Sequence, residues 1–417
     1  MTTLSMEDLV KRSMASWLAV LLSLAFGVGC TTPAAEEPEP SEAYGDAATA
    51  VNAFAFSLMG ELDSGENQVF SPFSIATTLA MVSAGTRGPT QEEFHEVLFF
   101  DADAANIHDA YGDLISQVVM DGGEEGPTVL VANSLWVQMC MSYGIDFLNT
   151  LEQSYRSEMR EVDYISDAEG ARGLINQWVA AQTRDLIDEL LPRGILSNLT
   201  RLVAVNALYV KASWQVPFEE SDTRDEPFTT AAGTTVEVPM MRREGSMRYL
   251  KNSRFEAVEL GYEGADLILL MVAPQRQRVP EFLTGLTAAS FAELREELDS
   301  GQVRLGLPRF SLDVPTGLRE SLIDLGLERA FDAETADFTP ISRDEDLFLH
   351  DVVHQATFDV DEKGTEAAAA TAAIIGIESM PDPDAFEDIT FDEPFAFFLI
   401  DGGSGAILFL GQVLDPS

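Results

Sequence analysis

Basic side chains are scarce in this sequence. Its 417 residues include 25 lysines and arginines against 70 aspartates and glutamates, and the formal net charge is −45. A surface with this excess of negative charge repels phosphate backbones and anionic lipid headgroups. Binding to nucleic acids and to anionic membrane surfaces is therefore excluded as an expected function. Two interpretations of the charge stay open: it keeps the protein in solution, or it steers a basic partner toward it.

Cysteine and histidine are also rare. The two cysteines, Cys30 and Cys140, form no CxxC pair and no disulfide framework. No neighbouring residue would activate the thiol of Cys140, so we expect a small buried side chain there. His350 and His354 have the i, i+4 spacing of helical metal ligands, but their segment alternates like a strand. We therefore expect one buried and one surface histidine, and neither a metal site nor a cofactor.

Motifs of the common enzyme classes are missing. The sequence contains no GxSxG elbow, no Walker A loop and no dinucleotide-binding glycine pattern. The glycine-rich residues 402–405 lie between two apolar runs and predict a turn. Carboxylates are so abundant that pairs of them at catalytic spacing are expected by chance. The sequence therefore gives no indication of an enzyme.

The N-terminus has the pattern of an export signal. An apolar run over residues 17–28 follows two cations, and it is shorter than the roughly 20 residues that cross a bilayer. The run ends in Gly-Val-Gly-Cys at residues 27–30, which resembles a bacterial lipobox, although Gly27 stands where leucine is usual. That resemblance implies a signal peptide over residues 1–30 and a lipidated Cys30. Ordinary secretion with cleavage nearby is the alternative.

A short acidic segment follows the signal. Residues 31–45 are rich in proline and glutamate, a composition that cannot bury a core, so we expect an extended tether. The folded domain is expected over residues 46–417, where no internal repeat or long linker occurs. The protein is therefore expected to be exported, and to be anchored by lipid to a bacterial membrane or extracellular.

Hydrophobic periodicity predicts a mixed domain of the α+β class. Apolar residues at helical spacing predict helices over residues 51–62 and 171–191, and Ser71-Pro72 is typical of a helix start. Apolar or alternating runs predict strands over residues 129–137, 202–209, 258–262 and 267–273, and a hairpin from residues 395–400 and 406–411.

One segment fits neither the helical nor the strand periodicity. Residues 361–381 contain an alanine-rich run followed by a proline-rich stretch. Propensity alone predicts a helix for the alanines. The run nevertheless belongs to a connection of about 30 residues between two predicted strands, which is uncommon in a compact domain and is usually functional or disordered.

Several motifs resemble those of the serpin family and occur in the family's order. They are NQVFSPFSI at residues 67–75, VANSLW at 131–136, INQWV at 175–179, VNALYVKASW at 205–214, LPRF at 307–310, DEPF at 392–395 and LFLG at 408–411. The segment from Glu362 to Thr371 is similar to the hinge of the reactive-centre loop in inhibitory members. The resemblance covers residues 46–417.

The resemblance implies both a fold and a mechanism. The fold has three β-sheets, eight to nine helices and an exposed reactive-centre loop, which would span about residues 362–390. A serine endopeptidase attacks a bait bond in the loop and forms an acyl-enzyme, and the cut loop then inserts into the central sheet and traps the protease. The predicted function is suicide inhibition by a monomer without catalytic residues of its own. Inhibition of a cysteine protease and a non-inhibitory binding or surface protein are the alternatives.

The residues of the predicted hinge suit insertion into a sheet. The hinge comprises Gly364, Thr365, Glu366, Ala367, Ala368, Ala369, Ala370 and Thr371. Strand alternation puts every second residue from Thr365 on one face, and these residues are small and uncharged, whereas Glu366 falls on the other face. Gly364 gives the pivot its backbone freedom.

The position of the bait bond follows from the family's spacing. The bait residue usually stands 14 positions after the hinge glycine, which implies a reactive bond between Glu378 and Ser379. A glutamate there suits a glutamate-specific protease. The remaining loop is longer than usual and acidic, which leaves a shifted bond open; Ile377 would then suit an elastase-like enzyme.

Other family positions carry over one by one. The polar cluster beneath the opening of the sheet matches Ser71, Ser74, Asn206 and His354, and the tryptophan where insertion begins matches Trp214. Each of these is also a plausible plain core residue. Residues 91–116 contain no lysine or arginine, so no glycosaminoglycan partner is expected. The expected partner is a target serine protease, and the only expected membrane contact is the N-terminal lipid anchor.

Overall fold

The computed structural model describes residues 42–62, 65–99, 107–123, 126–185, 187–344, 346–365 and 386–417. Several predicted site residues lie outside these ranges: the lipidation site Cys30, the hinge residues 366–371, and the bait residues Glu378 and Ser379. The first two hinge residues, Gly364 and Thr365, are within them.

Nine α-helices occur in the described part of the chain. They are α2 (Glu42–Leu62), α3 (Pro72–Ser83), α4 (Gly88–Val97), α5 (Ile107–Val118), α6 (Ile145–Tyr155), α7 (Tyr164–Gln182), α8 (Val279–Thr284), α9 (Ala288–Glu296) and α10 (Arg319–Asp324). α2 begins inside the segment that composition assigned to the tether. α3 begins as predicted, because the Ser71 hydroxyl accepts a hydrogen bond from the Ser74 N–H at 3.1 Å and Pro72 occupies the first turn.

The strands form two sheets. The seven-stranded sheet contains β2 (Met120–Asp121), β3 (Thr128–Gln138), β4 (Glu158–Val162), β5 (Leu202–Ser213), β11 (Phe310–Gly317), β12 (Val352–Val360) and β13 (Gly364–Thr365). The nine-stranded sheet contains β1 (Gln68–Phe70), β6 (Arg224–Thr229), β7 (Thr235–Lys251), β8 (Phe255–Gly261), β9 (Leu267–Pro274), β10 (Asp299–Pro308), β14 (Phe386–Thr390), β15 (Phe395–Asp401) and β16 (Ile407–Val413).

Strand β7 explains why the structure has two sheets where the resemblance implied three. It is 17 residues long and pairs with β6 over its first part, with β8 over its last part and with β10 along most of its length. Two of the three expected sheets are thereby joined through shared hydrogen bonds. The predicted α+β class is confirmed, and the C-terminal hairpin is present as β15 and β16.

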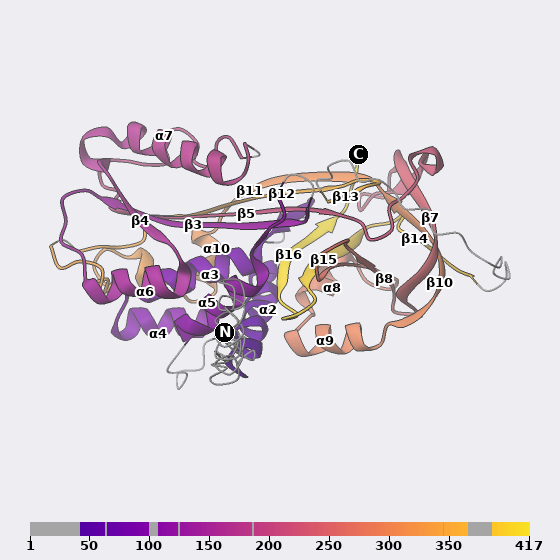
Figure 1. The fold of residues 1–417 in the computed structure, drawn as a ribbon, viewed down its shortest axis with the longest axis horizontal. Coiled ribbons are helices and arrows are strands. Elements are labelled where there is room, and N and C mark those ends of the chain that lie inside the picture. The colour runs from indigo at the N-terminus through magenta and orange to yellow at the C-terminus, as the bar shows by residue number, and fades with distance from the viewer. Residues whose placement is uncertain are drawn as a thin grey trace, which may run out of the picture. The chain divides into compact units, whose positions relative to one another are not determined.

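Helices cover both faces of the seven-stranded sheet. α7 lies on one face, which we call the outer face, and α3, α5 and α6 lie on the other, inner face (Figure 1). Alternation along β5 serves both sides: Leu208 and Val210 belong to the main core, whereas Val203 and Val205 belong to a second, smaller cluster beneath α7. The outer face is therefore held by a core of its own.

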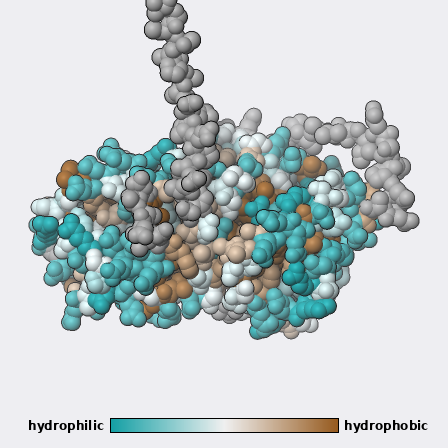
Figure 2. Space-filling view, turned by 90° about the horizontal axis from the view of Figure 1, so that it is seen from below, coloured by the Kyte–Doolittle hydropathy of each residue, from teal (hydrophilic) through white to brown (hydrophobic). Residues whose placement is uncertain are grey.

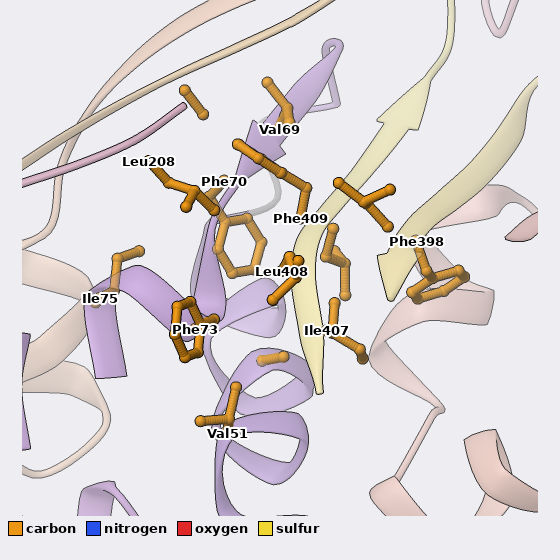
Figure 3. Packing of buried hydrophobic residues seen from close by; sticks show 14 of the residues in the cluster. Val51, Val69, Phe70, Phe73, Ile75, Leu208, Phe398, Ile407, Leu408 and Phe409 are labelled. Carbon is orange, nitrogen blue, oxygen red and sulfur yellow. The ribbon is translucent and has the colours of Figure 1, made fainter. Parts of the chain in front are cut away.

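The main core is built from segments far apart in sequence. Figure 3 shows Phe70 of β1 and Phe73 of α3 beside Leu408 and Phe409 of β16, with Leu208 of β5 close by. Every residue of α3 is buried, so this helix has no solvent-facing stripe and its conformation depends on packing from all sides. This arrangement fixes the inner face of the sheet.

The predicted helix over residues 171–191 is wrong at its C-terminal end. α7 stops at Gln182, and Arg184 and Asp185 follow with φ of 53° and 62°, a left-handed conformation that cannot continue a helix. Residues 183–185 and 187–201 instead form an irregular segment, hereafter the connector, that leads back to β5. The periodicity of this segment came from residues that pack on the sheet, such as Ile187.

Cys140 is a second correction. Its side chain is exposed rather than buried, because it lies in the turn after β3 with φ of 66°, and the chain there turns away from the sheet.

Apolar residues gather near the middle of the face in Figure 2, and its two ends are mainly hydrophilic. Among the described helices, none is both long enough and apolar enough to cross a membrane.

A gap in the seven-stranded sheet as the candidate functional site

Strands β5 and β12 are neighbours in the sheet but are paired directly at one end only. Residues 352–354 of β12 run parallel to residues 204–206 of β5 and pair with them. Beyond that point, within the described residues, no ladder pairing joins residues 207–211 of β5 to residues 355–359 of β12. The central sheet therefore contains a gap that is open along five residues of each strand.

The other end of the gap is closed by β13. Thr365 pairs antiparallel with Ala212 of β5 on one side and with Val360 of β12 on the other. A Cβ atom at Gly364 would lie 2.1 Å from the carbonyl oxygen of Ala212, so only glycine fits here. The start of the predicted hinge is thus already a short strand between β5 and β12.

The gap is a slot for backbone rather than a ligand pocket. Its cavity measures about 20 Å³, which is room for about one water molecule. Residues from both strands, from β13 and from the connector line it: Thr183, Ile187, Leu208, Tyr209, Val210, Thr357, Asp359 and Thr365. An extended chain needs more room than this and fits only once β5 and β12 move apart, when the facing strand edges offer it backbone donors and acceptors.

Aromatic residues anchor the hinge at its buried start. Thr365 is 1% exposed, and its hydroxyl shares a hydrogen bond of 2.5 Å with the hydroxyl of Tyr262. Trp214 stacks on Tyr262 with ring centroids 4.6 Å apart. The indole N–H of Trp214 donates to the carbonyl of Asp361 at 2.8 Å, and its backbone N–H donates to the carbonyl of Lys363 at 2.8 Å. Trp214 therefore holds the chain where it turns from β12 into the hinge.

A buried carboxylate adds a second anchor. Glu362 is 3% exposed, and it accepts hydrogen bonds from Thr223 at 2.7 Å and from the guanidinium of Arg309 at 2.6 and 2.7 Å. Burial by itself raises the pKa of Glu362, but the hydrogen bonds from Thr223 and Arg309 outweigh it and hold the pKa below 4.5. The carboxylate is therefore charged and paired at neutral pH.

The predicted polar cluster lies at the opposite end of the gap. The backbone N–H of Ser71 donates to Nε2 of His354 at 3.0 Å, so the neutral ring carries its proton on Nδ1. Burial lowers the pKa of His354 to about 3, and Nδ1 has no hydrogen-bond partner among the described residues. Asn206 pairs with His354 through the backbone. This cluster lies where the direct pairing of β5 and β12 ends.

The structure separates the predicted site residues into two groups. Ser71, Ser74 and His354 come together below the sheet, with the backbone of Asn206 beside them, whereas Trp214 lies with the hinge at the other end of the gap. Sequence reasoning missed the pair of Glu362 and Arg309, which are 53 residues apart, and also Thr223 and Tyr262. No local pattern marks such partners, because nothing in either segment specifies the other.

The sequence profile of the family described as serpin (serine protease inhibitor) matches residues 49–416. The chain belongs to the serpin family. The expected serpin fold is confirmed by the solved structure of human thyroxine-binding globulin in complex with thyroxine, to which this chain is similar with a TM-score of 0.80 and 26% identity over 90% of this chain and 100% of that one.

Two curated relatives extend the comparison. An uncharacterized serpin-like protein of Thermococcus kodakarensis is 37% identical over 88% of this chain and 85% of its own length. Plasminogen activator inhibitor 1 of Bos taurus is 31% identical over 96% of this chain and 98% of its own length. Relatives of this serpin thus include protease inhibitors, and the family description is that of inhibitors rather than of enzymes.

Glu362 provides a first test of the hinge anchor. We expect Glu362→Gln to lower the free energy of unfolding of the native serpin by about 2 kcal/mol at pH 7, because a neutral amide replaces charge-assisted hydrogen bonds in a buried position. The folded-state pKa of Glu362 is depressed, so its contribution is present above pH 4.5 and is lost as the pH falls through that pKa. Thermal midpoints of wild type and variant should converge on acidification.

The matched control is Glu220→Gln. Glu220 is 68% exposed and pairs with Lys363 at 3.3 Å, a surface ion pair beside the same hinge. Its loss should change the midpoint little at any pH, since exposed pairs contribute little. Equal losses from the two variants would show that Glu362 acts only as a surface charge.

His354 gives a test at the other end of the gap. The unfolded ring takes up a proton below about pH 6.5, whereas the folded ring does so only near pH 3. The free energy of unfolding should therefore fall as the pH drops from 6.5, by up to about 1.4 kcal/mol per pH unit from this group. His354→Gln, which keeps an acceptor but cannot titrate, should have a shallower slope of the urea midpoint between pH 6.5 and 4.

Ser71→Ala is the control for that slope. It removes the helix-capping hydroxyl of α3 and should cost about 1 kcal/mol, but it leaves the backbone N–H that bonds His354. It should lower stability at every pH without altering the slope. An unchanged slope in His354→Gln would assign the pH dependence to other groups.

Proposed function

We propose that this serpin is a suicide inhibitor of a serine endopeptidase that traps its target by inserting the cut reactive-centre loop into the gap between β5 and β12. One observation carries the proposal: the second hinge residue, Thr365, is already paired with both strands that flank the gap. A strand that starts in register at one end of an open slot needs only to continue along it. The relatives named as protease inhibitors support the same function.

The register of β13 predicts where each following residue would lie after insertion. Thr365 pairs with Ala212 and Val360, so continuing both antiparallel ladders brings position 367 between Val210 and Phe358. Both neighbours point into the main core. Alanine at position 367, and small residues at alternate positions beyond it, would fit against that core, and Glu366 would take the outer face.

Insertion would proceed in two physical stages. Positions 366–370 would enter the open part of the gap without breaking a ladder. Positions 371–373 would then replace the direct pairing between residues 352–354 and residues 204–206, exchanging parallel pairs for antiparallel ones, which are slightly more stable per residue. About ten new backbone hydrogen bonds at roughly 1 kcal/mol each give a driving force on the order of 10 kcal/mol. The uninserted state is therefore kinetically trapped.

The chemistry of the trap belongs to the protease. Its serine oxygen adds to the carbonyl carbon of the bait residue, the peptide C–N bond breaks, and the amine of the next residue leaves with a proton from the protease's histidine. We propose the bond between Glu378 and Ser379, which favours a glutamate-specific enzyme. The acyl-enzyme ester is then carried along with the inserting loop before water can hydrolyse it.

A protease panel tests this function. The full chain in mild detergent is mixed with glutamate-specific, elastase-like, trypsin-like and papain-like proteases, and denaturing gels and intact mass are recorded. We expect a covalent complex with the glutamate-specific enzyme and a released peptide that begins at Ser379. A complex with the papain-like enzyme alone would move the function to cysteine proteases. A peptide that begins elsewhere would move the bait bond.

Two adjacent hinge variants separate insertion from cleavage. Ala367→Arg would push a charged side chain into the core between Val210 and Phe358, so this variant should be cut without forming a complex. Glu366→Arg carries the same new side chain on the outer face and should still form the complex. If both variants trap the protease equally well, the register argued above is wrong.

A binding protein without inhibitory activity is the second candidate, because thyroxine-binding globulin has a similar structure. Heating the loop-cut chain decides between the two. Insertion adds a strand to the central sheet and should raise the thermal midpoint strongly, whereas a chain that has lost insertion should show no gain. The latter result, with no complex from any protease, would favour the binding protein.

We also propose that the protein is exported and held on a bacterial membrane by a lipidated Cys30. Expression of the full chain in a bacterial host should yield a protein in the membrane fraction, with an N-terminal mass that includes acyl chains. Cys30→Ala should move it to the soluble fraction without changing protease inhibition. Equal partitioning of the two proteins would favour ordinary secretion.

A further inference from the structure

The connector covers the gap from the outer face. Thr183 and Ile187 are both buried, and both line the cavity between β5 and β12. Side chains on the outer face of an incoming strand would need the space that these two residues occupy. The connector must therefore lift for a strand to enter, whatever drives the entry.

Internal hydrogen bonds make the connector one unit with α7. The hydroxyl of Thr183 donates to the carbonyl of Val179 at 2.9 Å and accepts from the N–H of Ile187 at 3.2 Å. The side-chain amide of Asn176 both donates to and accepts from the backbone of Leu191, at 3.0 and 2.8 Å. The connector and α7 can thus move together without breaking these hydrogen bonds. Whether they move is then decided by the contacts that attach this unit to the sheet.

Arg184 is such an attachment and lies next to the gap. Its guanidinium is 5.6 Å from the ring centroid of Tyr209 on β5, on the outer side of the sheet. The same group forms an ion pair with Asp121 of β2 at 3.0 Å and donates to the carbonyl of Gly123 at 3.3 Å. One side chain therefore ties the connector to two separate strands, and it follows directly after Thr183.

The backbone of Arg184 is held in an unfavourable conformation. Arg184 and Asp185 have φ of 53° and 62°, in the left-handed region that residues with a side chain rarely adopt. Two such residues in succession persist only where surrounding contacts impose them. The hydrogen bond from the Asp185 N–H to the carbonyl of Ala180, at 2.8 Å, is one such contact, and the contacts of the Arg184 side chain add to it.

We propose that Arg184 is a latch that holds the connector over the gap and sets the rate at which a strand enters the central sheet. The residue acts by positioning Thr183 and Ile187 rather than by touching the protease. The proposal rests on the proposed insertion function and names a residue that controls its speed.

The test measures strand entry without a protease. The full chain is incubated with a synthetic peptide of residues 366–378, and incorporation is followed over time by native gel and by the rise in thermal midpoint. Arg184→Ala should take up the peptide about five- to ten-fold faster than wild type, the size expected from losing one ion pair and one cation–π contact. High salt screens the ion pair and should narrow the difference.

Further variants separate the latch from general destabilisation. Arg184→Gly also removes the side chain but relieves the left-handed backbone, and it should accelerate uptake as well. Arg193→Ala removes the same charge from an exposed position in the same connector and should leave the rate unchanged. Asp121→Asn, at a side chain that is 61% exposed, should accelerate uptake, and combining it with Arg184→Ala should add little.

The outcomes distinguish this proposal from the proposed function. If the wild-type chain takes up no peptide and gains no heat stability when its loop is cut, insertion itself is overturned and the latch with it. If wild type takes up the peptide but Arg184→Ala and Asp121→Asn do so at the wild-type rate, the latch alone is overturned. Equal acceleration by Arg193→Ala would also overturn it, because any lost cation would then suffice. Should Arg184→Ala fail to fold, Asp121→Asn carries the test.

Discussion

The unfilled backbone edge between β5 and β12 is the constraint on which the rest of this structure depends. Buried peptide groups require partners, and an extended chain that pairs on both sides supplies more of them than water in a narrow slot. The sheet is held in its open form by contacts at its two ends. At one end three parallel pairs join the strands above His354, and at the other β13 is anchored by Trp214 and Glu362.

The division of the hydrophobic residues into two clusters follows from the same constraint. The main core joins α3, the inner face of the seven-stranded sheet and the nine-stranded sheet into one packed body. The second cluster lies between α7 with its connector and the outer face. On the proposed insertion, a strand in the gap would add side chains to the main core and displace part of the second cluster. The fold thus has a hydrophobic core on each face of the seven-stranded sheet.

Several of the scarce basic side chains have specific partners in the structure. Arg309 pairs with a buried carboxylate, Arg248 and Arg295 both contact Glu259, and Arg184 links two strands to the connector. In a chain with 25 basic against 70 acidic residues, the loss of one such cation leaves its acidic partner among other acids. Buried partners such as Glu362 and Glu259 are the sensitive ones, because water cannot compensate them.

The sequence by itself determined those features that depend on neighbours along the chain. The start of α3 at Ser71 and Pro72, the strands, the hairpin and the α+β class follow from local periodicity and capping. Family motifs also led to Ser71, Ser74 and His354, which the fold brings together. Only the tertiary structure decided that α7 ends at Gln182, that Cys140 is exposed, and that Glu362 meets Arg309. The gap itself, open for five residues and closed by Thr365, belongs to the same group, because strand pairing is chosen by distant partners, and a segment's own residues do not encode which edge it will leave unfilled.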